Sequence, residues 1–139
     1  MSTRAEPATT LRRSVLLVDD EETILFALED YLSAAGWDVA TARGRAAAER
    51  LLDERSFSAA VVDLRLSVAD EGGAEGLELA RSIRERRPEA RVLVLTAYGS
   101  RELEEAAQGL GVVAWLQKPQ PLDRLHDRLA SLVEGTQLS

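Results

Sequence analysis

The chain has 139 residues, 45% of them hydrophobic and 29% charged, which is enough for one globular domain with its own core. It contains no cysteine, so disulfide bonds and thiolate metal sites are excluded. The net charge of −7 argues against direct binding of nucleic acid, and no apolar run is long enough to span a membrane. We therefore expect a cytoplasmic protein.

Strand-like and helix-like patterns alternate five times along the chain. Short apolar runs predict strands at residues 15–18, 37–42, 59–62, 92–95 and 112–116. Apolar residues at helical spacing predict helices at residues 22–35, 45–54 and 101–108, one through Leu77 that stops before Pro88, and a last one beginning near Leu122. We expect Gly36 and Gly109 to end the first and fourth helices.

These segments predict a single domain over residues 13–134. We expect residues 1–12, which are polar and lack the apolar stretch of a signal peptide, to form a flexible tail. Residues 135–139 are expected to form a second tail. The basic cluster at residues 84–87 is interpreted as a solvated helix end, and the single histidine, His126, as a surface residue of the last helix.

The alternation predicts an α/β fold with helices on both faces of a parallel sheet. The runs at residues 15–18, 59–62 and 92–95 are apolar throughout, which is typical of strands that are covered on both sides. We predict a flavodoxin-like (βα)5 doubly wound sheet with five parallel strands in the order 2-1-3-4-5. Its switch point, where ligands bind, lies between the first and third strands.

Polar residues follow four of the predicted strands. Asp19 and Asp20 follow the first strand, Asp63 the third, Thr96 the fourth, and Lys118 the fifth. The carboxyl ends of parallel strands share one edge of the sheet, so these side chains are expected to meet there. Crowded carboxylates repel one another unless a cation neutralises them, and Mg²⁺ (or Mn²⁺) is the natural ion for oxygen ligands.

Each part of this set has another interpretation when it is taken alone. The acidic run at residues 19–22 could simply begin a helix, where negative charge is favourable. Asp63 could cap a turn, and Thr96 and Lys118 are common residues at such positions. Taken together, they predict phosphoryl chemistry in which Asp63 is the nucleophile and Asp19 and Asp20 hold the metal. The Lys118–Pro119 bond is a candidate for the cis form.

Four motifs in this order resemble one family. They are Val18-Asp19-Asp20, Val62-Asp63-Leu64-Arg65-Leu66, Val94-Leu95-Thr96-Ala97 and Lys118-Pro119. The chain resembles the receiver domain of two-component response regulators over nearly its whole length. The resemblance implies that Asp63 is a phosphoacceptor that takes its phosphoryl group from a sensor histidine kinase or a histidine phosphotransfer protein.

The resemblance also implies a role for each residue of the site. Mg²⁺ would be held by Asp19, Asp20, Asp63 and the backbone carbonyl of Arg65, while Thr96 and Lys118 would contact the phosphoryl group. Such domains are signalling phosphoacceptors and not enzymes in the usual sense. The residues two positions after Asp63 and Thr96, which are Arg65 and Tyr98, tune the lifetime of the acyl phosphate in this family. Both are large, so we expect a lifetime of minutes or longer.

A switch residue is implied at Trp115, where the family usually has Tyr or Phe. Its inward turn would remodel the face formed by the fourth helix, the fifth strand and the fifth helix. That face would bind a downstream protein target, and the chain would be a monomer or a weak dimer through it. The larger ring is expected to rotate less freely. No output domain follows the last predicted helix, so we expect a single-domain protein or a piece of a larger regulator.

Other departures from the family lie near the phosphoacceptor. Ser67 stands where Pro is usual, and Gln120 where Phe is frequent. The acidic segment at residues 67–75 makes the connection after Asp63 longer than usual, and it is either a functional loop or a tolerated insertion. Two other functions remain open: a phosphate-independent interaction module, and a phosphatase of the haloacid dehalogenase type. The second is disfavoured because Arg65 stands where that family needs an aspartate.

Overall fold

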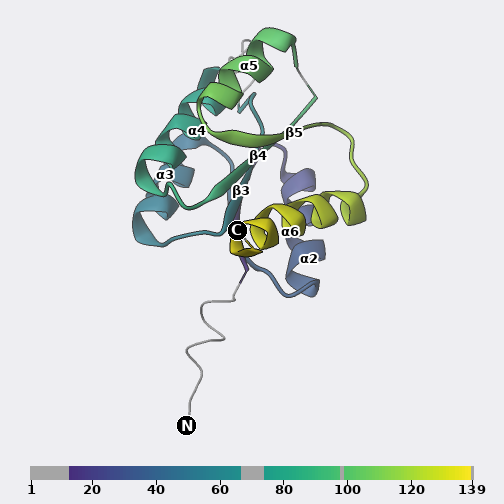
Figure 1. Ribbon diagram of the computed structural model, residues 1–139. Coiled ribbons are helices and arrows are strands. Elements are labelled where there is room, and N and C mark those ends of the chain that lie inside the picture. Colours follow the sequence, from purple (N-terminus) through teal and green to yellow (C-terminus); the bar gives the residue numbers. More distant parts are fainter. Residues whose placement is uncertain (1–12, 67–73, 98, 139) are drawn as a thin grey trace.

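Five parallel strands form the sheet of the computed structural model, which describes residues 13–66, 74–97 and 99–138 (Figure 1). The strands are β1 (Ser14–Val18), β2 (Asp38–Ala42), β3 (Ala59–Val62), β4 (Arg91–Thr96) and β5 (Val112–Gln117). Their order is β2-β1-β3-β4-β5, as predicted. β5 pairs with β4 through a register shift between Val92 and Leu93. The predicted fold class and strand order are therefore confirmed.

Helices cover both faces of this sheet (Figure 1). They are α2 (Glu22–Ala34), α3 (Arg45–Glu54), α4 (Ala74–Arg86), α5 (Arg101–Gly109) and α6 (Leu122–Leu138). Apolar side chains of α2 and α6 pack on one face, and those of α3, α4 and α5 pack on the other. Among the described residues, none of these helices is both long and apolar enough for a membrane crossing.

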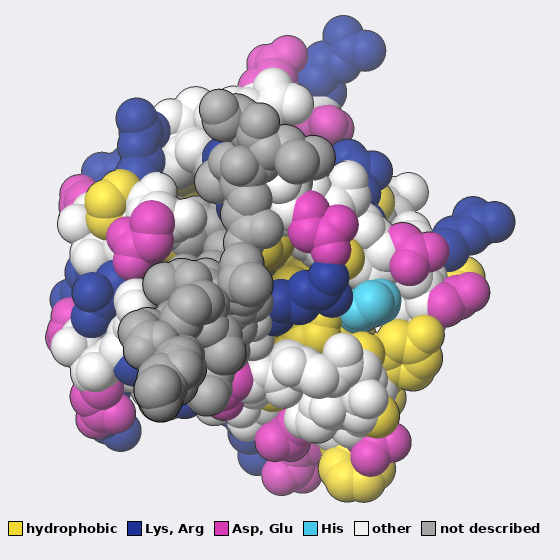
Figure 2. Space-filling model, turned by 60° about the horizontal axis from the view of Figure 1, so that its bottom comes forward, with side chains coloured by type: hydrophobic (Ala, Val, Ile, Leu, Met, Phe, Trp, Pro, Cys, Tyr) yellow, Lys and Arg dark blue, Asp and Glu magenta, His cyan; other side chains and the backbone are white. Residues whose placement is uncertain are grey.

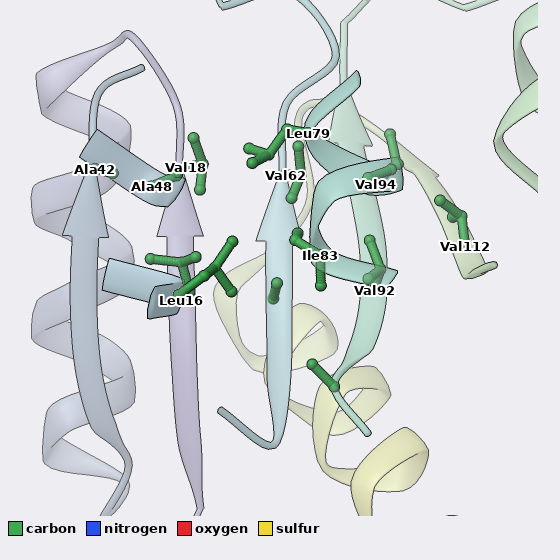
Figure 3. Close-up of a cluster of buried hydrophobic side chains, with 14 of the residues drawn as sticks. Leu16, Val18, Ala42, Ala48, Val62, Leu79, Ile83, Val92, Val94 and Val112 are labelled. Atoms are coloured by element: carbon green, nitrogen blue, oxygen red, sulfur yellow. The ribbon is translucent and has the colours of Figure 1, made fainter. Parts of the chain in front are cut away.

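The all-apolar strands supply the core on both faces. Leu16 and Val18 of β1 point toward α3 and α4, while Val15 and Leu17 point toward α2 and α6. Figure 3 shows the first of these clusters, in which side chains from the strands meet Ala48 of α3 and two residues of α4. A fully buried Leu or Val stabilises the fold by about 1.5–3 kcal/mol, so this double burial supplies much of the driving force.

Two helix ends differ from the sequence prediction. Gly36 follows α2 with a φ of 98°, as expected for a glycine that ends a helix. Gly109, however, is the last residue of α5, and Gly111 takes the positive φ, 93°, beyond it. The backbone of α6 continues to Leu138, past residue 135, where we expected a tail to begin. The predictions for residues 1–12 and for most of the loop at 67–75 lie outside the described residues, but Ala74 and Glu75 already belong to α4.

The basic cluster at the end of α4 ties helices together and is not simply solvated. Arg84 donates a hydrogen bond to the carbonyl of Gly109 at 3.0 Å, and Arg87 donates to the carbonyl of Leu52 at 2.8 Å. Arg86 forms ion pairs with Glu49 at 3.3 Å and with Asp53 at 3.1 Å. The cluster therefore joins α4 to both α3 and α5.

His126 is less exposed than we expected for a surface residue. Its side chain is 21% exposed and lies with ring centroids 6.1 Å from Tyr31 and 6.2 Å from Trp37. Nearby, Arg13 pairs with Glu134 and lies over the ring of Trp37 at 5.5 Å from its centroid. Figure 2 shows a face on which acidic and basic side chains are intermixed around the histidine.

Candidate functional site

Three aspartates meet where β1 and β3 end. The backbone N–H of Asp19 donates to the carbonyl of Ala42, and that of Asp63 donates to the carbonyl of Val18, so sheet pairing continues into the site. One carboxylate oxygen from each of Asp19, Asp20 and Asp63 lies within 4.8 Å of the others. Asp19 and Asp63 are almost completely buried, and Asp20 is half-buried. The aspartates of the two strand ends thus face one another across a short gap.

Lys118 directly follows the edge strand β5, and its side chain reaches into this group. Its Nζ donates to Asp19 Oδ2 at 2.7 Å and to Asp63 Oδ2 at 3.2 Å. The backbone N–H of Lys118 donates to the carbonyl of Thr96 at 2.9 Å, so the ends of β4 and β5 are joined beside the aspartates. Thr96 is fully buried. The peptide bond between Lys118 and Pro119 is cis, the form for which the sequence made it a candidate.

Burial and opposite charges act against each other in this group. Burial raises the pKa of Asp19, although the hydrogen bonds from Lys118 and from the backbone of Glu21 oppose the change. Burial alone would lower the pKa of Lys118, but the carboxylates of Asp19 and Asp63 outweigh it and raise that pKa. Lys118 therefore stays charged, and its single ammonium group contacts two of the three clustered aspartates.

The donor chemistry of the site fits a hard divalent cation. All three clustered side chains are carboxylates, which Mg²⁺ prefers, and their excess of negative charge would be neutralised by such an ion. The backbone after Asp63 is held close by, because the N–H of Arg65 lies 3.4 Å from Asp63 Oδ1. This turn keeps the main chain of Arg65 beside the aspartates.

Trp115 lies beside the loop that follows Thr96. It is half-buried, pairs in register with Val94 of β4, and packs against the core cluster on the side of α3, α4 and α5. A Cβ atom at Gly99 would lie 3.2 Å from Cζ2 of the Trp115 ring. The ring therefore occupies the space that a side chain at Gly99 would need. Tyr98, the other residue predicted in this loop, lies outside the described residues.

Residues 15–130 match the family model for the response regulator receiver domain. The chain belongs to this family. Receiver domains bind Mg²⁺ at an acidic pocket, and this chain has a cluster of three aspartates at the ends of β1 and β3. The resemblance found from four short motifs is thereby confirmed over most of the sequence.

Curated relatives belong to the same family, and the chain covers only part of the length of each. The photosynthetic apparatus regulatory protein RegA of Rhodobacter capsulatus is 39% identical over 123 residues, which cover 88% of this chain and 64% of RegA. Among the curated relatives compared, the chain spans 26% to 64% of their own length. It therefore corresponds to one part of longer regulators.

Solved structures share the fold. A CheY-like receiver domain protein from Methanospirillum hungatei superposes with a TM-score of 0.84 at 23% identity, covering 91% of this chain and 97% of that one. A response regulator from Burkholderia pseudomallei, solved with a phosphorylated aspartic acid, calcium ion and citrate, has a TM-score of 0.77 at 28% identity. That match covers 91% of this chain and 71% of the other.

Two residues near the site were missed by the sequence analysis of this receiver domain. Glu21 Oε1 accepts a hydrogen bond from Lys118 Nζ at 3.3 Å, which makes it a third carboxylate on that ammonium group. Its position directly after Asp19-Asp20 was a usable signal. Gly76 is buried against the backbone of Leu64, where an added Cβ would lie 2.3 Å from Cα. No local pattern shows such a contact, because it joins residues on either side of the long connection.

Proposed function

We propose that Asp63 accepts a phosphoryl group from a phosphohistidine of a sensor histidine kinase or a histidine phosphotransfer protein. The observation that carries this proposal is the setting of Asp63. It is buried at the end of a central strand, grouped with two other aspartates, and 3.2 Å from the ammonium of Lys118. The phosphorylated aspartic acid of the similar Burkholderia protein supports the same assignment.

The transfer is a displacement at phosphorus. A carboxylate oxygen of Asp63 forms the new bond to phosphorus while the bond from phosphorus to the histidine nitrogen breaks, and the imidazole keeps the electron pair. Asp19, Asp20, Asp63 and the carbonyl of Arg65 would hold Mg²⁺, which when bound neutralises charge on the phosphoryl oxygens.

Lys118 and Thr96 supply the remaining contacts to the phosphoryl group. The ammonium of Lys118 pairs with the free carboxylate of Asp63, and it would transfer to a phosphoryl oxygen when that carboxylate becomes an acyl phosphate. The hydroxyl of Thr96, on the neighbouring strand end, would donate to another oxygen. Arg65 and Tyr98 would shield the acyl phosphate from water, which gives a lifetime of minutes or longer.

Phosphorylation changes the charge of the site and thereby the surface around it. The modification adds about −1.5 to −2 charges and three acceptor oxygens. Movement of Thr96 toward them would free the ring of Trp115 to turn inward, between β5 and α5. The face formed by α5, β5 and α6 would then bind a downstream protein, or a second copy weakly. The chain acts as a cytoplasmic signalling phosphoacceptor, and any nucleic-acid binding of the longer regulators belongs to another part of them.

The test is intact-mass spectrometry after incubation with acetyl phosphate and Mg²⁺. We expect one phosphoryl adduct on the wild-type chain and on Asp53→Asn, a control at an exposed carboxylate on α3. We expect none on Asp63→Asn, and none when Mg²⁺ is chelated. If the wild-type chain gains no adduct, even from a phosphohistidine donor protein, the chain is a phosphate-independent interaction module instead.

A further inference from the structure

We infer that Glu21 is a positioning residue that competes with Asp63 and with the phosphoryl group for the ammonium of Lys118. This inference rests on the proposed phosphoacceptor function. Lys118 Nζ contacts three carboxylates, with Asp19 at 2.7 Å, Asp63 at 3.2 Å and Glu21 at 3.3 Å. The first two belong to the buried site. The third approaches from solvent, since the Glu21 side chain is 58% exposed.

The backbone of Glu21 is fixed on both sides, so its side chain alone is free to move. Its N–H donates to Asp19 Oδ1 at 3.0 Å, and its carbonyl accepts from the N–H of Leu25 at 3.2 Å. Glu21 is the N-cap residue of α2, but its side chain makes no capping hydrogen bond. Residues that cap helices well have shorter side chains. The longer Glu21 reaches Lys118 instead of the helix end.

Phosphoryl transfer changes what Lys118 must bind. Before transfer the ammonium is shared among the three carboxylates, and during transfer it must meet an oxygen of the incoming group. At that moment the ion pair with Glu21 draws the ammonium of Lys118 toward solvent and away from the phosphoryl group. The Glu21 carboxylate also repels the anionic donor. Removing this competitor should therefore speed phosphorylation of Asp63.

Three substitutions separate competition for Lys118 from simple charge. Glu21→Gln removes the charge. Glu21→Asp keeps it on a side chain one methylene shorter, which favours capping α2 over reaching Lys118. Glu29→Gln removes an equal charge from an exposed position about two turns further along α2. Rates are measured by intact-mass time courses with acetyl phosphate at saturating Mg²⁺.

We expect both Glu21 variants to be phosphorylated about two- to fivefold faster than wild type, the range that a partly exposed ion pair can provide. Glu29→Gln should match wild type. If Glu21→Asp matches wild type while Glu21→Gln is faster, only the charge matters and the inference is wrong. Equal rates for all four proteins would also overturn it.

A second measurement does not depend on phosphorylation. In urea unfolding without metal, Glu21→Gln should lower the midpoint in the wild-type background but not in Lys118→Met, because the pair is then already broken. Equal shifts in both backgrounds would contradict the contact on which the inference depends. A wild-type chain that gains no phosphoryl group but shows this coupling would refute the proposed function and leave the Glu21–Lys118 pair standing.

Discussion

Replacing Gly76 by Ala should destabilise the domain and disturb the site together. Gly76 lies in the first turn of α4, and its N–H donates to the carbonyl of Leu64 at 2.9 Å. Leu64 directly follows Asp63, the proposed phosphoacceptor. An Ala Cβ would lie 2.3 Å from Leu64 Cα, 2.4 Å from its carbonyl oxygen and 2.7 Å from its carbonyl carbon. All three are backbone atoms, so no side-chain rotation relieves the clash.

The size of the effect follows from these distances. Carbon atoms in van der Waals contact lie about 3.5–4.0 Å apart, so the two backbone segments must separate by roughly 1 Å or more. Overpacking of this kind costs about 1–3 kcal/mol, and we expect the upper end because both partners are main chain. The displaced segment includes Arg65, whose carbonyl is a proposed metal ligand. We therefore also expect weaker binding of Mg²⁺.

Urea unfolding measures the loss of stability. The affinity for Mg²⁺ is measured by the rise of the melting temperature as Mg²⁺ is titrated in. Gly109→Ala is the matched control, because Gly109 is also helical but has nothing within 4 Å of an added Cβ. Its replacement should leave stability unchanged or raise it by about 0.5–1 kcal/mol. A Gly76→Ala protein as stable as Gly109→Ala would refute the reasoning. Lower stability with unchanged Mg²⁺ affinity would refute only the link to the site.

Three further predictions concern charged groups. Lys118→Met leaves two buried aspartates unpaired and should cost roughly 3 kcal/mol of unfolding free energy without metal, measured by urea unfolding. Mg²⁺ should raise the melting temperature of wild type in calorimetry, with a smaller rise in Asp20→Asn. The hydrogen bond from Arg45 lowers the pKa of Glu49, so Glu49 stabilises the fold above its ordinary pKa and loses this as pH falls through the lower folded value. Glu49→Gln should therefore cost about 0.5–1 kcal/mol near neutral pH but little in acid, as urea midpoints across pH would show.

The fold and the meeting of the site residues followed from simple features of the sequence. All-apolar runs mark strands that are covered on both faces, and a doubly wound sheet then brings the ends of the strands to one edge. The pattern of the strands alone was therefore enough to group Asp19, Asp63 and Lys118. The prediction worked because it depends on strand order and not on side-chain detail.

Contacts between distant helices were not predictable in the same way. Gly109 and Gly111 are both suited to follow a helix, and local rules do not choose between them. In the structure Arg84 of α4 donates to the carbonyl of Gly109, and the chain turns at Gly111 instead. Arg87 likewise donates a hydrogen bond to a residue on another helix, at the carbonyl of Leu52. Sequence patterns indicate a solvated side chain whenever the partner of a charged residue lies on another element.

Trp115 shows how such a contact bears on the proposed switch. From the sequence, the large ring was expected to move less freely than the usual Tyr or Phe. In the structure the ring lies against Gly99, and a Cβ there would approach it to 3.2 Å. Gly99 follows Thr96 by three residues, and Trp115 precedes Lys118 by three. The large ring of Trp115 therefore fits beside the end of β4 because Gly99 has no side chain. If phosphorylation moves Thr96 as proposed, the motion would reach the ring beside Gly99, so we expect the proposed switch to depend on Gly99 as much as on Trp115.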